Sequence, residues 1–191
     1  MQVEKNQLTS KDLLLTMLYC PGSTSKCNEP IAGRTRIMKM VFLFEKELYK
    51  QFFSDLVIDL PEFKPYNYGP FSDKVFEDLR IFESLEFITK ANTKIPVSSA
   101  EIFEWSMEED DDDDEGETPK KGAVEIEYSL SKKGVKFVEE KIWHNFSEAQ
   151  RKNLINFKTQ INTISLDSLL RYVYSKYPKD VEKSLIADKY I

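Results

Sequence analysis

Apolar residues recur along most of this chain with the spacing of amphipathic helices. The longest pattern runs from Arg34 to about Phe53, and its apolar side chains fall on one helical face: Ile37, Met40, Val41, Phe44 and Leu48. A shorter helix is expected before it, capped by Ser10 and stopped by Pro21. A third helix is expected to begin at Ser72, which can cap it.

The spacing changes to two residues in the middle of the chain. Residues 102–107 and 124–130 alternate apolar and polar side chains, as half-buried strands do. An acidic, glycine-containing stretch joins them, so we expect a hairpin with a long tip. Helical spacing then returns, with three start signals and one stop: Ser131, the capping box of Ser147 and Gln150, Ser165, and finally Pro178.

The order of these elements predicts the fold class. Three helices followed by a two-stranded hairpin is the order of a winged helix-turn-helix. We therefore expect an α+β, mostly α fold, with a two-stranded wing and a C-terminal helical extension. The winged-helix domain would span residues 1–145, with an acidic disordered wing tip at 108–122, and the extension would span 146–191. The apolar stripe from Leu166 to Tyr177 packs either on its own domain or on a second copy, which would give a homodimer through the C-terminal helices.

Charge narrows the function classes only a little. The net charge is −6, but nine of the 33 acids lie between Glu108 and Glu117, which leaves 24 acids against 27 bases elsewhere. The charge balance therefore neither indicates nor excludes a nucleic-acid partner. The acidic run itself allows three interpretations: mimicry of nucleic acid toward a basic partner, loose calcium binding, or a solvated hairpin tip.

Few residues suit catalysis or metal binding. His144 is the only histidine, and no serine or cysteine lies in a nucleophile motif. Cys20 and Cys27 lack the spacing of a zinc site, and a disulfide is not expected in a reducing compartment. We expect a non-enzymatic protein with no cofactor and no metal. No apolar run approaches the ~20 residues of a membrane span, and no signal segment is recognisable, so a cytoplasmic protein without a membrane partner is expected.

Two arginines lie where the longest helix begins, beside the positive end of its dipole. Arg34 and Arg36, with the free N–H groups of the helix, suit a phosphate. They suit an internal carboxylate such as Asp73 or Glu77 equally well. Lys39, one turn further along, would join them in a phosphate site.

Three aromatic residues surround the turn that precedes the third helix. Tyr66, Tyr68 and Phe71 flank a Gly-Pro pair and can form a lip for a base or a peptide. The alternative is that these rings pack the turn against the core.

The third helix occupies the position that would enter a DNA major groove. From Ser72 to Glu86 it carries five acids and only two bases, Lys74 and Arg80. Such a helix is repelled by phosphates unless its acids turn away. Ser72, Lys74 and the preceding Tyr68 lie nearest the end that usually reads bases.

Three segments together resemble a known family: Gly33 to Leu43, Tyr68 to Ser72, and Leu169 to Pro178. They are similar to the YwgA-like family of bacterial and archaeal proteins and, more distantly, to the Panacea domain of SocA-like antitoxins. The resemblance implies a winged-helix-like fold in a prokaryotic cytosol, with a role in regulation, toxin neutralisation or mobile-element defence. It supplies no catalytic residues.

The residues support two hypotheses. In the first, the protein is a winged-helix regulator that contacts DNA through six residues: Arg34, Arg36, Lys39, Tyr68, Ser72 and Lys74. In the alternative, it is an antitoxin-like or adaptor-like module that binds a partner protein through Tyr66, Tyr68, Phe71 and Arg34. The acidic tip would then steer a basic partner.

Overall fold

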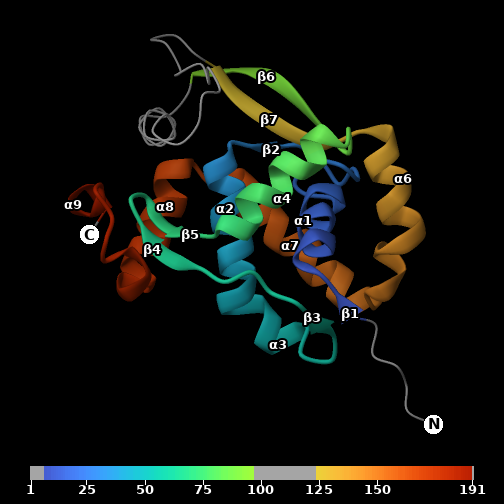
Figure 1. The fold of residues 1–191 in the computed structure, drawn as a ribbon, viewed down its shortest axis with the longest axis horizontal. Helices are drawn as coiled ribbons and strands as arrows, with labels where there is room; N and C mark the ends of the chain where they lie inside the picture. The colour runs from blue at the N-terminus through green and yellow to red at the C-terminus, as the bar shows by residue number, and fades with distance from the viewer. Residues whose placement is uncertain (1–6, 97–123, 191) are drawn as a thin grey trace.

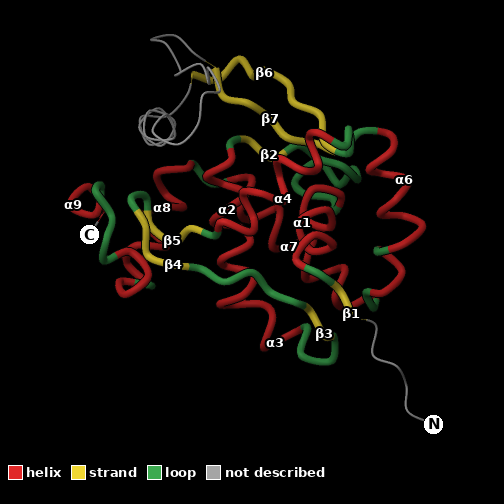
Figure 2. Tube along the Cα trace, in the orientation of Figure 1, coloured by secondary structure: helices red, strands yellow, loops and turns green. Residues whose placement is uncertain are grey.

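The computed structural model describes residues 7–96 and 124–190. Within these ranges the fold is α+β and mostly helical, with small sheets at its edges (Figures 1 and 2). The strand expected at 102–107 and the acidic tip expected at 108–122 lie outside the described residues.

The first helix, α1 (Ser10–Tyr19), is capped one residue earlier than expected. Thr9 is the N-cap, and it forms a capping box with Asp12. Ser10 is buried instead, and its hydroxyl donates to the carboxylate of Asp78 at 3.1 Å. A threonine three residues before an aspartate was a start signal available in the sequence.

The long helical pattern is confirmed as one continuous helical run with a wider turn inside it. It consists of α2 (Arg34–Leu43), the π-helical segment η1 (Phe44–Tyr49) and the short α3 (Lys50–Phe52). Every residue of α2 after Arg34 is buried, so α2 is the central helix of the fold (Figure 1). A helix buried on all sides that carries Arg36 and Lys39 must satisfy both cations internally.

Two pairs of short strands lie beside the helices. β1 (Gln7–Leu8) pairs in parallel with β3 (Val57–Ile58), and β4 (Lys64–Tyr66) pairs with β5 (Gly69–Phe71) in a tight hairpin. The hairpin leads into α4 (Asp73–Ser84), which Ser72 caps as expected.

The largest sheet among the described residues has the strand order β2-β7-β6. β2 (Ile31–Ala32) and β6 (Ile88–Pro96) both pair antiparallel with the central strand, β7 (Val124–Leu130). The strand expected at 124–130 is therefore confirmed. β6 was not expected, because Thr89, Lys90 and Asn92 are polar and exposed and leave no alternating pattern.

The C-terminal part of the chain is helical after β7. Its elements are α6 (Lys132–Lys141), η3 (Trp143–Asn145), α7 (Glu148–Thr163), α8 (Leu166–Lys176), η4 (Pro178–Val181) and α9 (Ala187–Tyr190). All of the expected caps form: Ser131 for α6, Ser147 with Gln150 for α7, and Ser165 for α8. In α6, Gly134 is required because a Cβ there would collide with the carbonyl oxygen of Phe87.

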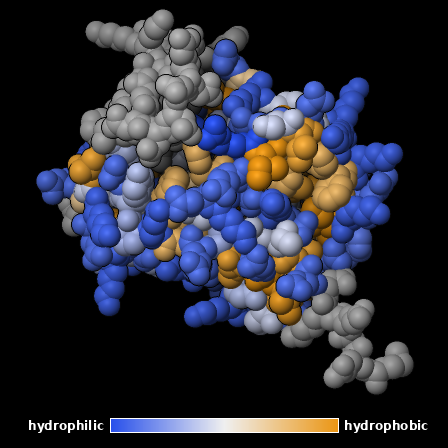
Figure 3. Space-filling view, viewed as in Figure 1, coloured by the Kyte–Doolittle hydropathy of each residue, from blue (hydrophilic) through white to orange (hydrophobic). Residues whose placement is uncertain are grey.

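The described parts of residues 1–145 and 146–191 share one hydrophobic core. The apolar stripe of α8 lies inside it, with Leu166, Leu169, Leu170 and Val173 all buried. This stripe therefore packs on its own chain and is not available to a second copy. No helix in the described ranges is long and apolar enough to cross a membrane. Polar side chains cover much of the visible surface, with hydrophobic side chains gathered beside α6 (Figure 3).

Candidate functional site

Arg36 points into the fold and not toward a ligand. It is 7% exposed, and its guanidinium donates to the backbone carbonyls of Ile161 and Ile164, and of Ala32 at 3.3 Å. The two isoleucines lie at the C-terminal end of α7, where carbonyls lack helical partners and the dipole is negative. The anion that offsets Arg36 is therefore a helix end. Asp73, one of the carboxylates expected in that role, lies against Lys64.

Lys39 is also internal. It is 1% exposed, and its ammonium donates to the carbonyl of Pro70 at 3.0 Å, which ties the β4–β5 hairpin to α2. In the DNA-binding hypothesis, Arg36 and Lys39 were expected to touch phosphates. Burial corrects that expectation, because neither charge reaches the surface in this fold.

A third cation follows the same pattern and was not among the sequence candidates. Lys158 is completely buried, and its ammonium donates to the carbonyls of Leu18 and Cys20, both at 2.8 Å, at the end of α1. Burial lowers the pKa of Lys158 from 10.5 to about 8, because the charged form loses its hydration. Its partners are backbone atoms, which leave no signal in the sequence.

The turn between β4 and β5 is fastened to the C-terminal segment. Gly69 has φ +86°, and a Cβ there would lie 3.1 Å from the ring of Tyr174. The carbonyl of Asn67 accepts hydrogen bonds from the Ser184 hydroxyl at 3.1 Å and from the backbone of Leu185 at 2.9 Å. Tyr68 is buried in this arrangement. Tyr68 therefore packs the turn against the core, as the second interpretation of the aromatic turn predicted, and does not contribute to a surface for a base or a peptide.

The other two rings of the turn do reach the surface. Tyr66 is 44% exposed, and Phe71 is partly buried beside it with 5.1 Å between ring centroids. Phe71 also contacts Phe76 of α4 at 6.0 Å. Three aromatic rings from the hairpin and α4 thus form a continuous row with solvent access.

Three cations lie over this row. The guanidinium carbons of Arg34 and Arg80 lie 5.5 Å and 5.9 Å from the centroid of Phe76. The ammonium of Lys64 lies 5.7 Å from the centroid of Tyr66. These distances suit cation–π attraction. We call this group the cation–aromatic surface: Arg34, Lys64, Tyr66, Phe71, Phe76 and Arg80.

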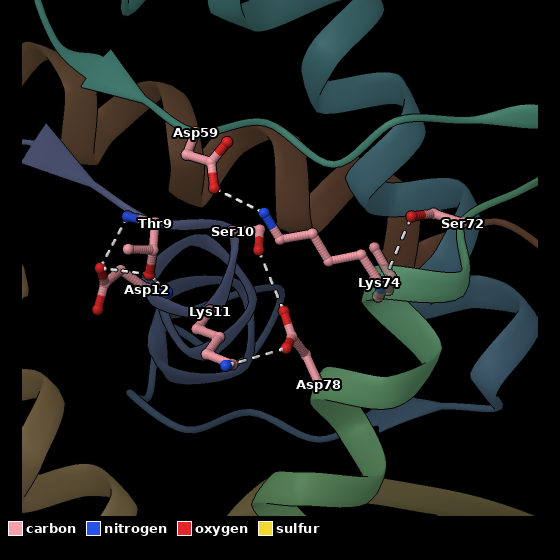
Figure 4. A network of polar contacts seen from close by, with 9 residues as sticks. Thr9, Ser10, Lys11, Asp12, Asp59, Ser72, Lys74 and Asp78 are labelled. Carbon is pink, nitrogen blue, oxygen red and sulfur yellow. Dashed lines mark hydrogen bonds and ion pairs between the residues drawn. The ribbon is translucent and has the colours of Figure 1, made fainter.

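The acids of α4 are largely offset by lysines of other elements. Three of its four acids lie against such lysines: Asp73 against Lys64 at 2.6 Å, Asp78 against Lys11 at 3.6 Å, and Glu83 against Lys90. Asp78 is buried between α4 and the start of α1 (Figure 4). The negative charge that the sequence assigns to this helix is therefore much weaker at its surface.

The two remaining DNA candidates on α4 differ in their access. Ser72 is buried, and its hydroxyl accepts from the backbone N–H of Val75 at 3.4 Å as the helix cap. Lys74 is exposed and extends toward Asp59, with 2.6 Å between ammonium and carboxylate (Figure 4). Lys74 alone of this pair can meet a ligand.

A separate titratable cluster fastens α8 to η1. One oxygen of Glu47 accepts from Tyr172 at 2.8 Å, Tyr177 at 2.7 Å and Lys176 at 3.0 Å. Burial alone would raise the pKa of Glu47, but these hydrogen bonds outweigh it and lower the pKa. Glu47 lies in the π-helical segment η1, and such segments often accompany functional sites. Here, however, three donors already occupy the carboxylate oxygen, so Glu47 stabilises the packing of α8 against η1.

The structure thus brings Arg34, Tyr66 and Phe71 together on one surface and leaves Lys74 exposed nearby. It places Arg36, Lys39, Tyr68 and Ser72 inside the fold. Lys64, Phe76 and Arg80 complete the surface and were missed. The spacing of four residues between Phe76 and Arg80 on a helix is a signal for one shared face. Comparisons with protein-family models, curated proteins and solved structures find no match to this chain.

Proposed function

We propose that the protein is a non-enzymatic, winged-helix module of a prokaryotic regulatory system that binds a partner protein through the cation–aromatic surface. The observation that carries this proposal is the row of three partly exposed rings under three cations, drawn from α2, the β4–β5 hairpin and α4. The resemblance to antitoxin-like families points in the same direction.

The order of elements supports a winged helix. The sequence of α1, β2, α2, α4, β6 and β7 is helix, strand, two helices and a hairpin, and the sheet order puts the first strand beside the last. α4 then corresponds to the recognition helix, and β6 with β7 to the wing. α7 to α9 form the extension.

The composition of the surface favours a protein partner. Tyrosine and arginine are the residues most often found at the energetic centre of protein interfaces. Their apolar area adds to binding, while stacked guanidinium groups keep edge donors for partner carboxylates or carbonyls. A duplex would instead need a row of accessible cations, and two of the expected ones, Arg36 and Lys39, are buried.

A quantitative capture experiment tests the proposal. Tagged wild-type protein and the variant Tyr66→Ala/Arg80→Ala are purified from cells of the natural host, and co-purifying proteins are quantified by mass spectrometry. We expect a defined partner with the wild type, and binding of the purified partner about 30-fold weaker for the variant. The control Phe52→Ala/Lys141→Ala removes an exposed ring and an exposed cation elsewhere. Equal capture by the variant, or no defined partner for the wild type, would refute the proposal.

DNA contact is the second candidate function, favoured by the winged-helix order and by the offset acids of α4. In that case Arg34, Lys74 and Arg80 would meet phosphates. Random duplex DNA titrated at about 50 and about 200 mM salt separates the two candidates, because counterion release makes phosphate binding fall steeply with salt. No association at the lower salt concentration would remove this candidate.

A further inference from the structure

A second exposed apolar area lies where α4 ends and α6 begins. Leu85 is 50% exposed, Ile81 41% and Phe137 37%, and Phe87 is partly buried. Figure 3 shows hydrophobic side chains gathered at this place, beside α6. We call Ile81, Leu85, Phe87 and Phe137 the α4–α6 patch.

The α4–α6 patch is distinct from the cation–aromatic surface. Ile81 follows Phe76 by five residues, and Leu85 follows Arg80 by five. Five residues along a helix correspond to about 140° around its axis. The two surfaces therefore lie on opposite flanks of α4, and one partner on the first flank leaves the second one open.

The patch is held in place before any partner arrives. The ring of Phe87 lies 5.4 Å from that of Phe137, and the ammonium of Lys133 lies 4.7 Å from the centroid of Phe87. The same ammonium donates to the carbonyl of Leu85 at 3.0 Å. Gly134 lets the backbone of Phe87 approach α6 closely. Such a preorganised surface loses little conformational entropy on binding.

The first turn of α6 carries charges that oppose its dipole. Lys132, Lys133 and Lys136 lie in its first half and its first turn has no acid, while its last three residues are Glu139, Glu140 and Lys141, of which only Lys141 follows the preferred order. Stable helices prefer the opposite order. An anionic group bound near the start of α6 would remove this conflict.

The neighbouring acids only partly offset these lysines. Lys136 pairs with Glu140 at 3.8 Å, and Glu139 accepts from a tyrosine hydroxyl of α1. Among the described residues, no ion pair involves Lys132 or Lys133. Glu86 is the adjoining acid from the end of α4. The edge of the patch is therefore positive, because the charges of Lys132 and Lys133 and the dipole of α6 together exceed the single negative charge of Glu86.

We propose that the α4–α6 patch binds an acidic amphipathic helix of a partner protein. Apolar side chains of that helix would cover Leu85, Phe87 and Phe137, and its carboxylates would meet Lys132 and Lys133. A helix that lays its apolar face on a preformed apolar surface is a recurrent mode of recognition. This surface is independent of the partner that the cation–aromatic surface binds.

Titrations with two synthetic amphipathic peptides, followed by NMR of the backbone amides, test the proposal. One peptide of about 18 residues carries leucines on one face and glutamates on the other, and its counterpart carries lysines in place of the glutamates. We expect the glutamate peptide to shift the amides of residues 81–87 and 132–137 saturably, with a dissociation constant below about 1 mM. The lysine peptide should bind at least about tenfold more weakly.

Variants with matched controls locate the binding. Leu85→Ser and Lys132→Glu should each weaken the glutamate peptide at least about fivefold. Leu185→Ser and Lys152→Glu, which change an exposed leucine and an exposed lysine elsewhere, should not. Equal binding of the two peptides, shifts at other residues, or no saturable shift would overturn the proposal. So would binding of anionic lipid vesicles at the patch in place of the peptide.

Discussion

The contrast between two neighbouring arginines gives the sharpest test of the fold. Arg36 is buried and donates to three backbone carbonyls, whereas Arg34, two residues earlier, is partly exposed and lies over the ring of Phe76. We compare Arg36→Met with Arg34→Met, because methionine keeps much of the apolar stem and removes the donors. The two changes are identical in chemistry and differ only in location.

The expected magnitudes follow from the partners. Each hydrogen bond from a charged donor contributes about 1.5–3 kcal/mol, and a carbonyl left buried without a donor costs about 1–3 kcal/mol. Removing a buried charge also recovers several kcal/mol of desolvation. We therefore expect Arg36→Met to lose about 3 kcal/mol of unfolding free energy. Arg34 is partly exposed, so water replaces much of what its guanidinium loses, and Arg34→Met should lose only about 1 kcal/mol.

Urea unfolding followed by circular dichroism measures both values, and thermal unfolding provides a second measurement. For a chain of this size, a loss of about 3 kcal/mol lowers Tm by about 6–12 °C. A loss of less than about 1 kcal/mol for Arg36→Met would contradict the assignment of Arg36 as an internal cap of α7. Equal destabilisation of the two variants would contradict it as well.

Two more predictions concern buried charges. Between pH 8 and 10.5 the unfolded chain keeps the proton of Lys158, whereas the folded protein releases it. The unfolding free energy of the wild type, relative to that of Lys158→Met, therefore rises with pH in this window. The rise is up to about 1.4 kcal/mol per pH unit. Urea midpoints at about pH 7, 8.5 and 10 check this, and a constant difference contradicts it. Burial alone would raise the pKa of Glu29, but hydrogen bonds from Thr24 and Asn162 lower it to about 2. A Cβ at Gly22 would collide with this carboxylate and displace it from these donors. Gly22→Ala should therefore lower the unfolding free energy by about 1–3 kcal/mol in urea unfolding at neutral pH. An unchanged urea midpoint would contradict this prediction.

Local signals predicted local structure well. The caps at Ser72, Ser131, Ser147 and Ser165 are confirmed because a cap depends on residues within one turn of it. The first helix is capped by Thr9 because the threonine, and not the following serine, is placed three residues before an acid.

Long-range partners could not be predicted. Arg36 is offset by the carbonyls of Ile161 and Ile164, and Lys39 by that of Pro70. Every residue has a carbonyl, so no side chain in the sequence marks these acceptors. A carboxylate partner was expected because only charged side chains were considered. The acceptors at the end of α7 are backbone carbonyls, and the residues that carry them are uncharged isoleucines.

The candidate surface was predicted in part. Arg34, Tyr66 and Phe71 were identified because an arginine at a helix start and aromatic residues at a turn are visible in the sequence. Tyr68 was wrongly placed with them, since the glycine after it turns the chain against Tyr174. Phe76 was not among the predicted site residues, and the structure shows it partly buried beside Phe71.

Site-specific photo-crosslinking tests the central claim most directly. A benzophenone side chain placed at Tyr66 in the natural host should give one protein adduct of defined mass, and Arg80→Ala should reduce it at least about tenfold. The same group at Phe52, which is exposed to a similar degree, should give no such adduct. A nucleic-acid adduct at Tyr66, or equal adducts at both positions, would contradict the proposed partner-binding surface.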